Sequence, residues 1–263
     1  MSIIEAIILG IVQGLTEFLP VSSSGHLTIG KEILGIESNN LAFEVAVHAA
    51  TVLSTIVAFR KDILSLVQGL FKFRFNKETD YIFKIGLSMI PIFIVGFFLK
   101  DFVESLFGSG LLIVGVSLLV TSSLLFLSHK IKPKERELKK SDAFIIGISQ
   151  ALAVLPGLSR SGATISTGLM LGVKREEIAR FSFLMVLVPI LGEATLELFS
   201  GEFSSASTGI DTLSLTAGFI AAFISGLFAC KAMIALVKKA KLTGFAIYCA
   251  LAGSVSIIYS LLF

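Results

Sequence analysis

Hydrophobic residues in this chain gather into long runs that short polar connections separate. Each of six runs approaches the roughly 20 apolar residues that a membrane-spanning helix needs. The six runs are Leu41–Phe59, Tyr81–Leu99, Leu111–Ser128, Ile178–Phe199, Leu213–Leu236 and Gly244–Phe263. Runs of this kind predict an all-α polytopic membrane protein that forms a single integral membrane domain over residues 1–263.

The composition agrees with a lipid environment. Charged residues make up 16 % of the chain and hydrophobic residues 54 %, and the mean hydropathy is +0.91, whereas soluble domains carry about 25 % charged residues. We expect no cleavable signal peptide, because the first segment lacks a basic start and contains Glu5 and Glu17. Cys230 and Cys249 lie in apolar runs, so their expected role is packing.

Basic residues concentrate in alternate connections between the runs. They are Arg60, Lys61, Lys72, Arg74 and Lys77, then Lys130, Lys132, Lys134, Arg136, Lys139 and Lys140, then Lys238, Lys239 and Lys241. The connections between these contain Lys100 alone after the second run and no Lys or Arg between Ser200 and Ser214. The positive-inside rule therefore places the three basic connections in the cytoplasm.

This orientation requires two segments that enter the membrane and return to the same side. Met1–Gly30 and Ala143–Gly168 are read as these re-entrant segments, because a full crossing by either would reverse every later connection. Both termini are then extracytoplasmic. The stretch Ile63–Phe75 has apolar residues among flanking charges and predicts an amphipathic helix on the cytoplasmic surface.

The two re-entrant segments resemble each other at a constant spacing of 137 residues, as from Ala6 to Ala143. The other matching pairs are Gly10 and Gly147, Gln13 and Gln150, Leu15 and Leu152, Ser22 and Ser159, Ser24 and Ser161, and Gly25 and Gly162. Because three spans follow each copy, the second copy is upside down. The sequence thus predicts an inverted-topology repeat, residues 1–130 and 141–263, each half a re-entrant helix hairpin plus three transmembrane helices.

Each re-entrant segment contains a proline followed by hydroxyl groups. Pro20 ends the first half-helix, and Ser22, Ser23, Ser24 and Gly25 supply a turn and a helix start. Exposed N–H groups at a helix start bind anions. Gln13 and Glu17 are four residues apart and share one helix face. Glu17 is therefore expected beside His26 and the serines.

The second segment repeats the break at Pro156 but carries an arginine. Arg160 costs at least about 2.5 kcal/mol within a bilayer, so an anionic partner is expected, either Glu17 or a ligand phosphate. A guanidinium grips phosphate bidentately. The residues expected to contact a phosphorylated substrate are Gln13, Ser22, Ser24, Gly25, Ser159, Ser161, Gly162 and Thr164.

Simpler readings stay open for individual residues. Serine and glycine often serve close packing of membrane helices, and Glu17 with Arg160 is also consistent with a purely structural ion pair. His26 is also consistent with a satisfied interior histidine. Other polar residues left open are Glu44 and His48, with a possible supporting role, and Glu193 and Glu197, which either line the cavity or reach the outer surface.

Two motifs carry a family resemblance. QGLTEFLPVSSSGHL (Gln13–Leu27) and PGLSRSGAT (Pro156–Thr164) resemble the signature regions of the undecaprenyl-pyrophosphate phosphatase, or bacitracin-resistance, family. FEVAVHAATVLSTIVAFRKDI (Phe43–Ile63) is similar to the family's next segment. The resemblance covers essentially the whole chain, and two long motifs at this separation are highly specific.

The resemblance implies hydrolysis of undecaprenyl diphosphate to undecaprenyl phosphate and inorganic phosphate outside the cytoplasm. This reaction recycles the lipid carrier of cell-wall synthesis and confers bacitracin resistance, since bacitracin competes by binding the substrate. The resemblance also implies that the protein needs a divalent cation, Mg²⁺ or Ca²⁺, and that it does not bind nucleic acid. The family's functional positions fall on Glu17, Ser23, His26 and Arg160, with Gln13 and Ser159 supporting. Some members have glutamate at the position of Gln13, so Glu17 takes the main acidic and metal-binding role.

The expected mechanism assigns a role to each of these residues. Arg160 and the turn hydroxyls hold the terminal phosphate, Glu17 binds the cation, Ser23 attacks or orients water, and His26 acts as general base and then acid. A lipid transporter is the alternative, because inverted repeats with broken helices are a transporter architecture. The Glu17, Ser23 and His26 combination favours hydrolysis, because a carrier requires no acid–base pair.

Overall fold

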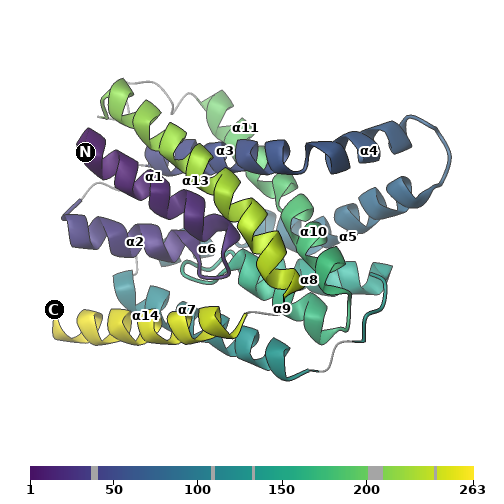
Figure 1. The fold of residues 1–263 in the computed structure, drawn as a ribbon. Coiled ribbons are helices and arrows are strands. Elements are labelled where there is room, and N and C mark those ends of the chain that lie inside the picture. The colour runs from purple at the N-terminus through teal and green to yellow at the C-terminus, as the bar shows by residue number, and fades with distance from the viewer. Residues whose placement is uncertain (37–40, 108–109, 132–133, 201–209, 240–241) are drawn as a thin grey trace.

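The computed structural model describes the chain except for residues 37–40, 108–109, 132–133, 201–209 and 240–241 (Figure 1). The described residues are almost entirely helical. Their helices are α1 (Ile3–Phe18), α2 (Ser23–Leu34), α3 (Leu41–Ala58), α4 (Arg60–Leu70), α5 (Lys77–Phe98), α6 (Lys100–Phe107), α7 (Gly110–Lys130), α8 (Lys140–Leu152), α9 (Arg160–Met170), α10 (Arg175–Met185), α11 (Leu187–Ser200), α13 (Thr212–Lys238) and α14 (Thr243–Leu262). Of the basic residues in the predicted cytoplasmic connections, Lys132 and Lys241 lie outside the described residues.

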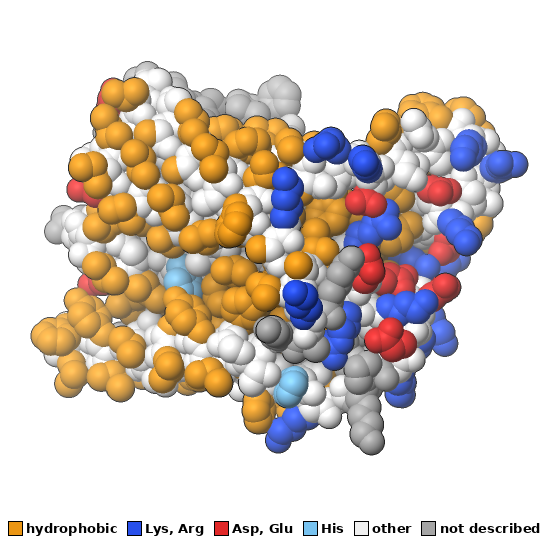
Figure 2. Space-filling model, in the orientation of Figure 1, with side chains coloured by type: hydrophobic (Ala, Val, Ile, Leu, Met, Phe, Trp, Pro, Cys, Tyr) orange, Lys and Arg blue, Asp and Glu red, His pale blue; other side chains and the backbone are white. Residues whose placement is uncertain are grey.

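Among the described residues, four helices, α5, α7, α13 and α14, are long and apolar enough to cross a membrane. The pair α3 and α4 is a fifth candidate, bent by 74° at Phe59. These helices confirm a polytopic, all-α membrane protein. Figure 2 shows hydrophobic side chains covering one end of the visible face and Lys and Arg side chains gathered at the other. Both termini lie at the hydrophobic end (Figure 1).

The predicted span Ile178–Phe199 is wrong as a single helix. The structure divides this run into α10 and α11 at Val186. Pro189 has no N–H with which to donate to the Met185 carbonyl one turn earlier, and the break falls within that turn.

The predicted amphipathic helix is present but shifted. It runs over Arg60–Leu70 as α4, rather than over Ile63–Phe75, and exposes Leu64, Val67 and Leu70. The chain leaves the helix after Leu70, and Phe73 has a positive φ of 47°. A non-glycine residue with this φ does not continue a right-handed helix.

Arg136, which precedes the second helix hairpin (α8 and α9), forms hydrogen bonds with both ends of that hairpin. Arg136 donates to both carboxylate oxygens of Asp142 in α8, at 2.5 and 2.8 Å, and to the Leu171 carbonyl at the end of α9, at 2.9 Å. The hydrogen bonds to Asp142 raise the pKa of the Arg136 guanidinium further above its ordinary value. Arg136 therefore joins the start of α8 to the end of α9.

Small residues allow each hairpin to approach a long helix closely. α1 packs along α13 and α8 along α5. A Cβ atom on Gly10 would lie 2.3 Å from the Gly218 carbonyl oxygen, and one on Gly147 would lie 2.4 Å from the Ser88 carbonyl oxygen. Both positions, which match in the sequence repeat, therefore require glycine for the helices to pack.

We expect Gly147→Ala to destabilise the protein. Because the Ser88 backbone stands where the new methyl group would lie, overpacking should cost about 1–3 kcal/mol. Thermal unfolding of the purified protein in detergent measures the effect. Gly86→Ala is the matched control, because a Cβ there has no neighbour within 4 Å. It should leave the melting temperature unchanged or raise it, and equal melting temperatures for the two variants would contradict the packing argument.

Candidate functional site

The first broken helix forms one wall of the site. α1 ends at Phe18, Leu19 is extended before Pro20, and α2 begins at Ser23, as the proline predicts. Ser22 has a φ of 73°, unusual for a residue with a side chain and costing about 1–3 kcal/mol. Its Oγ accepts the Gly25 N–H at 3.3 Å and so caps α2.

The second broken helix repeats this construction. α8 ends at Leu152 and α9 begins at Arg160, with Gly157 at a φ of 85° in the turn between them. The Ser159 Oγ accepts the Gly162 N–H at 3.0 Å and caps α9. The hydroxyl oxygens of Ser22 and Ser159 thus both accept a backbone N–H of their own turn. The contact of these two serines with substrate stays a prediction.

The two turns contact each other reciprocally. The Ser24 Oγ accepts the Gly157 N–H at 3.3 Å, and the Ser161 hydroxyl donates to the Leu19 carbonyl at 3.2 Å. Ser24 and Ser161 are equivalent in the sequence repeat. A Cβ on Gly25 would lie 3.1 Å from the Gly157 Cα. The two broken segments are therefore in direct contact.

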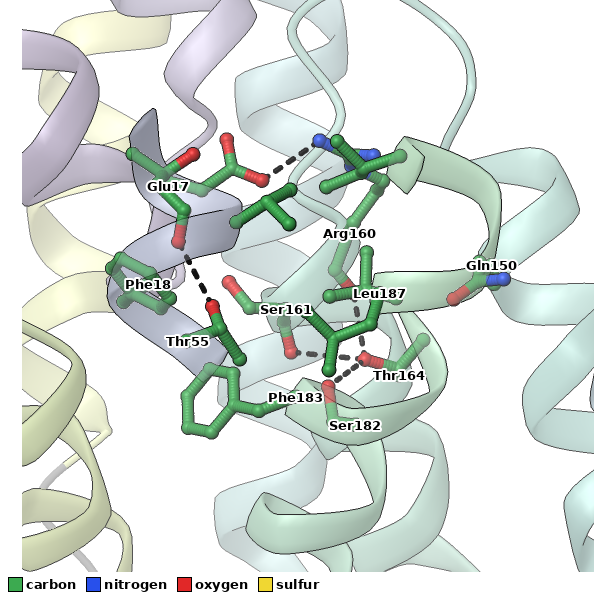
Figure 3. Close-up of a pocket in the computed structure, with 14 residues that line it drawn as sticks. Glu17, Phe18, Thr55, Gln150, Arg160, Ser161, Thr164, Ser182, Phe183 and Leu187 are labelled. Carbon is green, nitrogen blue, oxygen red and sulfur yellow. Dashed lines mark hydrogen bonds and ion pairs between the residues drawn. The ribbon is translucent and has the colours of Figure 1, made fainter. Parts of the chain in front are cut away.

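A buried ion pair joins the turns. Arg160 Nη2 lies 2.8 Å from Glu17 Oε1, and the side chains are 24 % and 7 % exposed (Figure 3). The second Glu17 oxygen, Oε2, accepts the Ser23 hydroxyl at 2.5 Å and the Gln13 amide at 3.0 Å. The predicted shared face of Gln13 and Glu17 is confirmed. The structure thus brings an acid, an arginine and a serine together.

His26 lies in a different environment from the one predicted. Its Nδ1 is 2.8 Å from the Ser22 carbonyl oxygen, and its Nε2 is 2.6 Å from the Tyr248 hydroxyl in α14. Its ring stacks on Tyr248 with centroids 5.5 Å apart. The hydroxyl of Ser23 donates to Glu17 instead. The role of His26 as an acid and base stays a prediction, and Tyr248 is a contact that the sequence gave no reason to expect.

A pocket extends from the ion pair between α3, α9 and the α10–α11 break. Figure 3 shows Glu17 and Arg160 at one side of the lining residues and Thr164 and Ser182 at another. The hydroxyl oxygens of Thr164 and Ser182 are 2.6 Å apart. The remaining lining residues are Phe18, Thr51, Val52, Thr55, Gln150, Ser161, Phe183, Val186, Leu187 and Ile190. Sequence reasoning missed Thr51, Thr55 and Ser182 because a lone hydroxyl in an apolar helix is typical of packing.

Of the two polar residues of α3 that the sequence left open, His48 lies near this site. Glu44 pairs with Lys31, and the His48 Nε2 is 3.7 Å from Glu17 Oε2. The side chains of Glu193 and Glu197 fall outside the described part of the structure.

The oxygen atoms of Glu17 and Gln13 suit a divalent cation whose remaining ligands come from the substrate. Within the described ranges there is no group of three or more His, Cys, Asp or Glu side chains able to hold a metal ion. Glu17 nevertheless offers carboxylate oxygens, and the Gln13 Oε1 is buried with no hydrogen-bond partner there. Mg²⁺ characteristically takes one or two carboxylates and completes its shell with water and substrate phosphates. These residues fit such an ion.

The chain matches the family model described as "Bacitracin resistance protein BacA" over residues 6–255. It is 59 % identical over 261 residues to an undecaprenyl-diphosphatase of Bacteroides fragilis, covering 97 % of each chain. It is 58 % identical over 267 residues to one of Parabacteroides distasonis, covering 100 % of each. A relative of that name from Carboxydothermus hydrogenoformans is 40 % identical over 252 residues, covering 94 % of each.

Proposed function

We propose, since this chain belongs to the bacitracin resistance protein BacA family, that it hydrolyses undecaprenyl diphosphate at the extracytoplasmic side of the membrane. The protein is a phosphatase of this polyprenyl diphosphate lipid and releases undecaprenyl phosphate and inorganic phosphate. The reaction recycles the lipid carrier for cell-wall synthesis and confers bacitracin resistance. The observation that carries the proposal is the Glu17–Arg160 pair, which joins the two turns beside the Ser23 hydroxyl.

Arg160 and the start of α9 receive the terminal phosphate. The guanidinium lies at the first residue of α9, so the positive end of that helix and the arginine act on the same anion. Ser161, the next residue, and Thr164, one turn further along, offer hydroxyls. The apolar wall of the pocket, which includes Phe183 and Leu187, accommodates the start of the prenyl chain.

Ser23 is the nucleophile. Its Oγ attacks the terminal phosphorus, the bond to undecaprenyl phosphate breaks, and the hydroxyl proton passes to Glu17 Oε2, 2.5 Å away. Water activated by His26 then attacks the phosphoserine, the bond between phosphorus and the Ser23 Oγ breaks, Glu17 returns the proton to that oxygen, and inorganic phosphate leaves. Positioning and charge neutralisation supply most of the rate enhancement in phosphoryl transfer. Mg²⁺ or Ca²⁺, when bound, neutralises the diphosphate charge, and Glu17 with Gln13 would hold it.

An inverted-topology repeat organises this site. The packing of α1 along α13 and of α8 along α5 supports it, because the two pairs occupy equivalent places in the two halves. The equivalent caps at Ser22 and Ser159 support it as well. The outward orientation is supported by the termini, which lie away from the end where Lys and Arg side chains gather (Figures 1 and 2).

Purified protein in detergent tests the proposal. We expect phosphate release from both farnesyl (C15) and undecaprenyl (C55) diphosphates with Mg²⁺ or Ca²⁺, and its loss on chelation. Bacitracin should lower the rate in proportion to the substrate it sequesters. Right-side-out vesicles should hydrolyse C15 diphosphate added outside. Binding of the lipid without phosphate release under any of these conditions would favour the transporter alternative.

A further inference from the structure

Gln150 in α8 lines the pocket, but it has no part in the mechanism above. It is the counterpart of Gln13 in the sequence repeat, and the Gln13 amide donates to Glu17 one turn later. The residue one turn after Gln150 is Val154, whose side chain offers no acceptor. The second hairpin therefore keeps the amide of the first but lacks the carboxylate that receives its hydrogen bond.

Both polar atoms of the Gln150 side chain are buried without a hydrogen-bond partner among the described residues. The residue as a whole is 1 % exposed. A buried donor and a buried acceptor that stay unsatisfied cost free energy, so such atoms are usually paired with protein, ordered water or a ligand. Because Gln150 lines the pocket, the missing partner is a molecule that occupies the pocket.

The chemistry of the amide identifies this partner. The Gln150 Nε2 only donates hydrogen bonds, and its Oε1 only accepts them. A phosphate group presents acceptor oxygens, so it would satisfy Nε2 and leave Oε1 without a donor. A water molecule both donates and accepts, and therefore suits both atoms. The centre of a water molecule can occupy about 20 Å³ of the pocket, more than the roughly 10–15 Å³ that one bound water needs.

The place of Gln150 in the pocket matches the direction from which water must attack. In phosphoryl transfer the attacking and leaving oxygens lie roughly in line, so water that hydrolyses the phosphoserine approaches from the side opposite the Ser23 Oγ. That Oγ donates to Glu17 Oε2. Figure 3 shows Glu17 and Gln150 on opposite sides of Arg160, the residue that receives the phosphate in the mechanism above. The apolar side chains of the pocket wall offer water no hydrogen bond.

We propose that Gln150 is a positioning residue that binds the hydrolytic water through both polar atoms of its amide. This inference rests on the proposed function, because it names the side chain that retains water in the pocket while Ser23 is phosphorylated. The reaction itself is unchanged. The water oxygen bonds to phosphorus, the proton of the water passes to His26, and the bond between phosphorus and the Ser23 Oγ breaks. Gln150 exchanges no proton in this step.

Gln150→Met keeps the length of the side chain and removes both polar atoms. Because misplaced reactants cost about 10²-fold in rate, we expect hydrolysis of the phosphoserine to slow by about this factor while its formation continues. Rapid quenching with C15 diphosphate should then show a burst of farnesyl phosphate equal to the enzyme concentration, and mass spectrometry should find phosphate on Ser23. Values of kcat and KM should fall together and leave kcat/KM unchanged, which a general loss of folding would not produce.

Two further variants serve as rescue and control. Gln150→Asn retains an amide and should recover part of the lost kcat. Gln68→Met makes the same substitution on the exposed surface of α4 and should leave every kinetic constant unchanged.

Solid-state NMR of the wild type in lipid bilayers detects the bound water without an activity assay. The chain contains three glutamines, Gln13, Gln68 and Gln150, so the spectrum of Gln150→Met assigns the side-chain ¹⁵N signal of Gln150. Magnetisation should pass from water protons to this buried nitrogen about as fast as it passes to the exposed nitrogen of Gln68.

The possible outcomes separate the inference from the proposed function. A wild-type protein that releases phosphate but passes no magnetisation from water to Gln150 would overturn the inference alone. So would a Gln150→Met variant that loses kcat/KM without accumulating phosphoserine, or one with wild-type kinetics. Water at Gln150 in a protein that cleaves no lipid diphosphate would overturn the function and leave a hydrated pocket without a hydrolytic role. If Gln150→Met does not fold, the water transfer measured on the wild type and the kinetics of Gln150→Asn decide.

Discussion

Arg160→Ala should abolish phosphate release from C15 diphosphate in detergent. The variant loses the guanidinium that pairs with Glu17 at 2.8 Å and that receives the phosphate. Arginines that stabilise phosphoryl transfer contribute about 10³–10⁵-fold to the rate. Breaking a buried pair also costs about 3–5 kcal/mol of stability, because the remaining charge is uncompensated. We therefore expect kcat/KM to fall by at least about 10³-fold and the melting temperature to decrease.

Two variants separate the chemical role of Arg160 from its contribution to stability. Arg160→Lys keeps the positive charge but loses the bidentate geometry, so its melting temperature should approach that of the wild type while its rate stays low. Arg180→Ala is the matched control, because Arg180 pairs with Asp62 at a more exposed site outside the pocket. Its kcat/KM should match the wild type. Wild-type activity in pure, folded Arg160→Ala would refute the assignment.

Glu17→Gln should have an effect of similar size on the rate. The amide preserves shape but no longer accepts the Ser23 proton or holds a cation, so we expect a loss of about 10²–10⁴-fold or more. The control is Glu5→Gln on the same helix. Glu5 belongs to the capping box at the start of α1, so its loss should lower stability slightly and leave kcat/KM unchanged. The assay is steady-state phosphate release, with the melting temperature measured in parallel.

The combined variant gives an independent check of the ion pair. Glu17→Gln/Arg160→Ala leaves neither charge buried, so its loss of stability should be smaller than the sum of the two single losses. Additive losses would show that the two side chains do not interact in the folded protein.

The part of the fold that local chemistry determines was predictable from the sequence. Pro20 ends its half-helix at once, because it lacks an N–H and restricts Leu19, whereas α8 ends at Leu152, four residues before Pro156. The caps at Ser22 and Ser159 also depend on local chemistry, because a serine hydroxyl accepts a free N–H at a helix start. The contact between the two turns, which the hydrogen bonds of Ser24 and Ser161 make, was not stated by the sequence pattern.

The remainder depends on contacts between distant segments. The break at Val186 lies inside a run whose hydropathy favours one continuous span, and Pro189 alone did not distinguish it from α5, which continues through Pro91. The sequence places His26 three residues after Ser23, yet the fold turns its ring toward Tyr248, 222 residues away. Neither the helix break at Val186 nor the contact of His26 with Tyr248 can be predicted from the residues next to it in the sequence.

The ion pair also constrains how the protein is made. Arg160 follows Glu17 by 143 residues, which at about 5–20 residues per second takes the ribosome roughly 7–30 s. Throughout this interval the first hairpin has its carboxylate but not the guanidinium that compensates it. Burying the Glu17 side chain therefore costs more free energy before the second hairpin has emerged than afterwards. The ion pair favours the final depth of the first hairpin only once the second hairpin is in place.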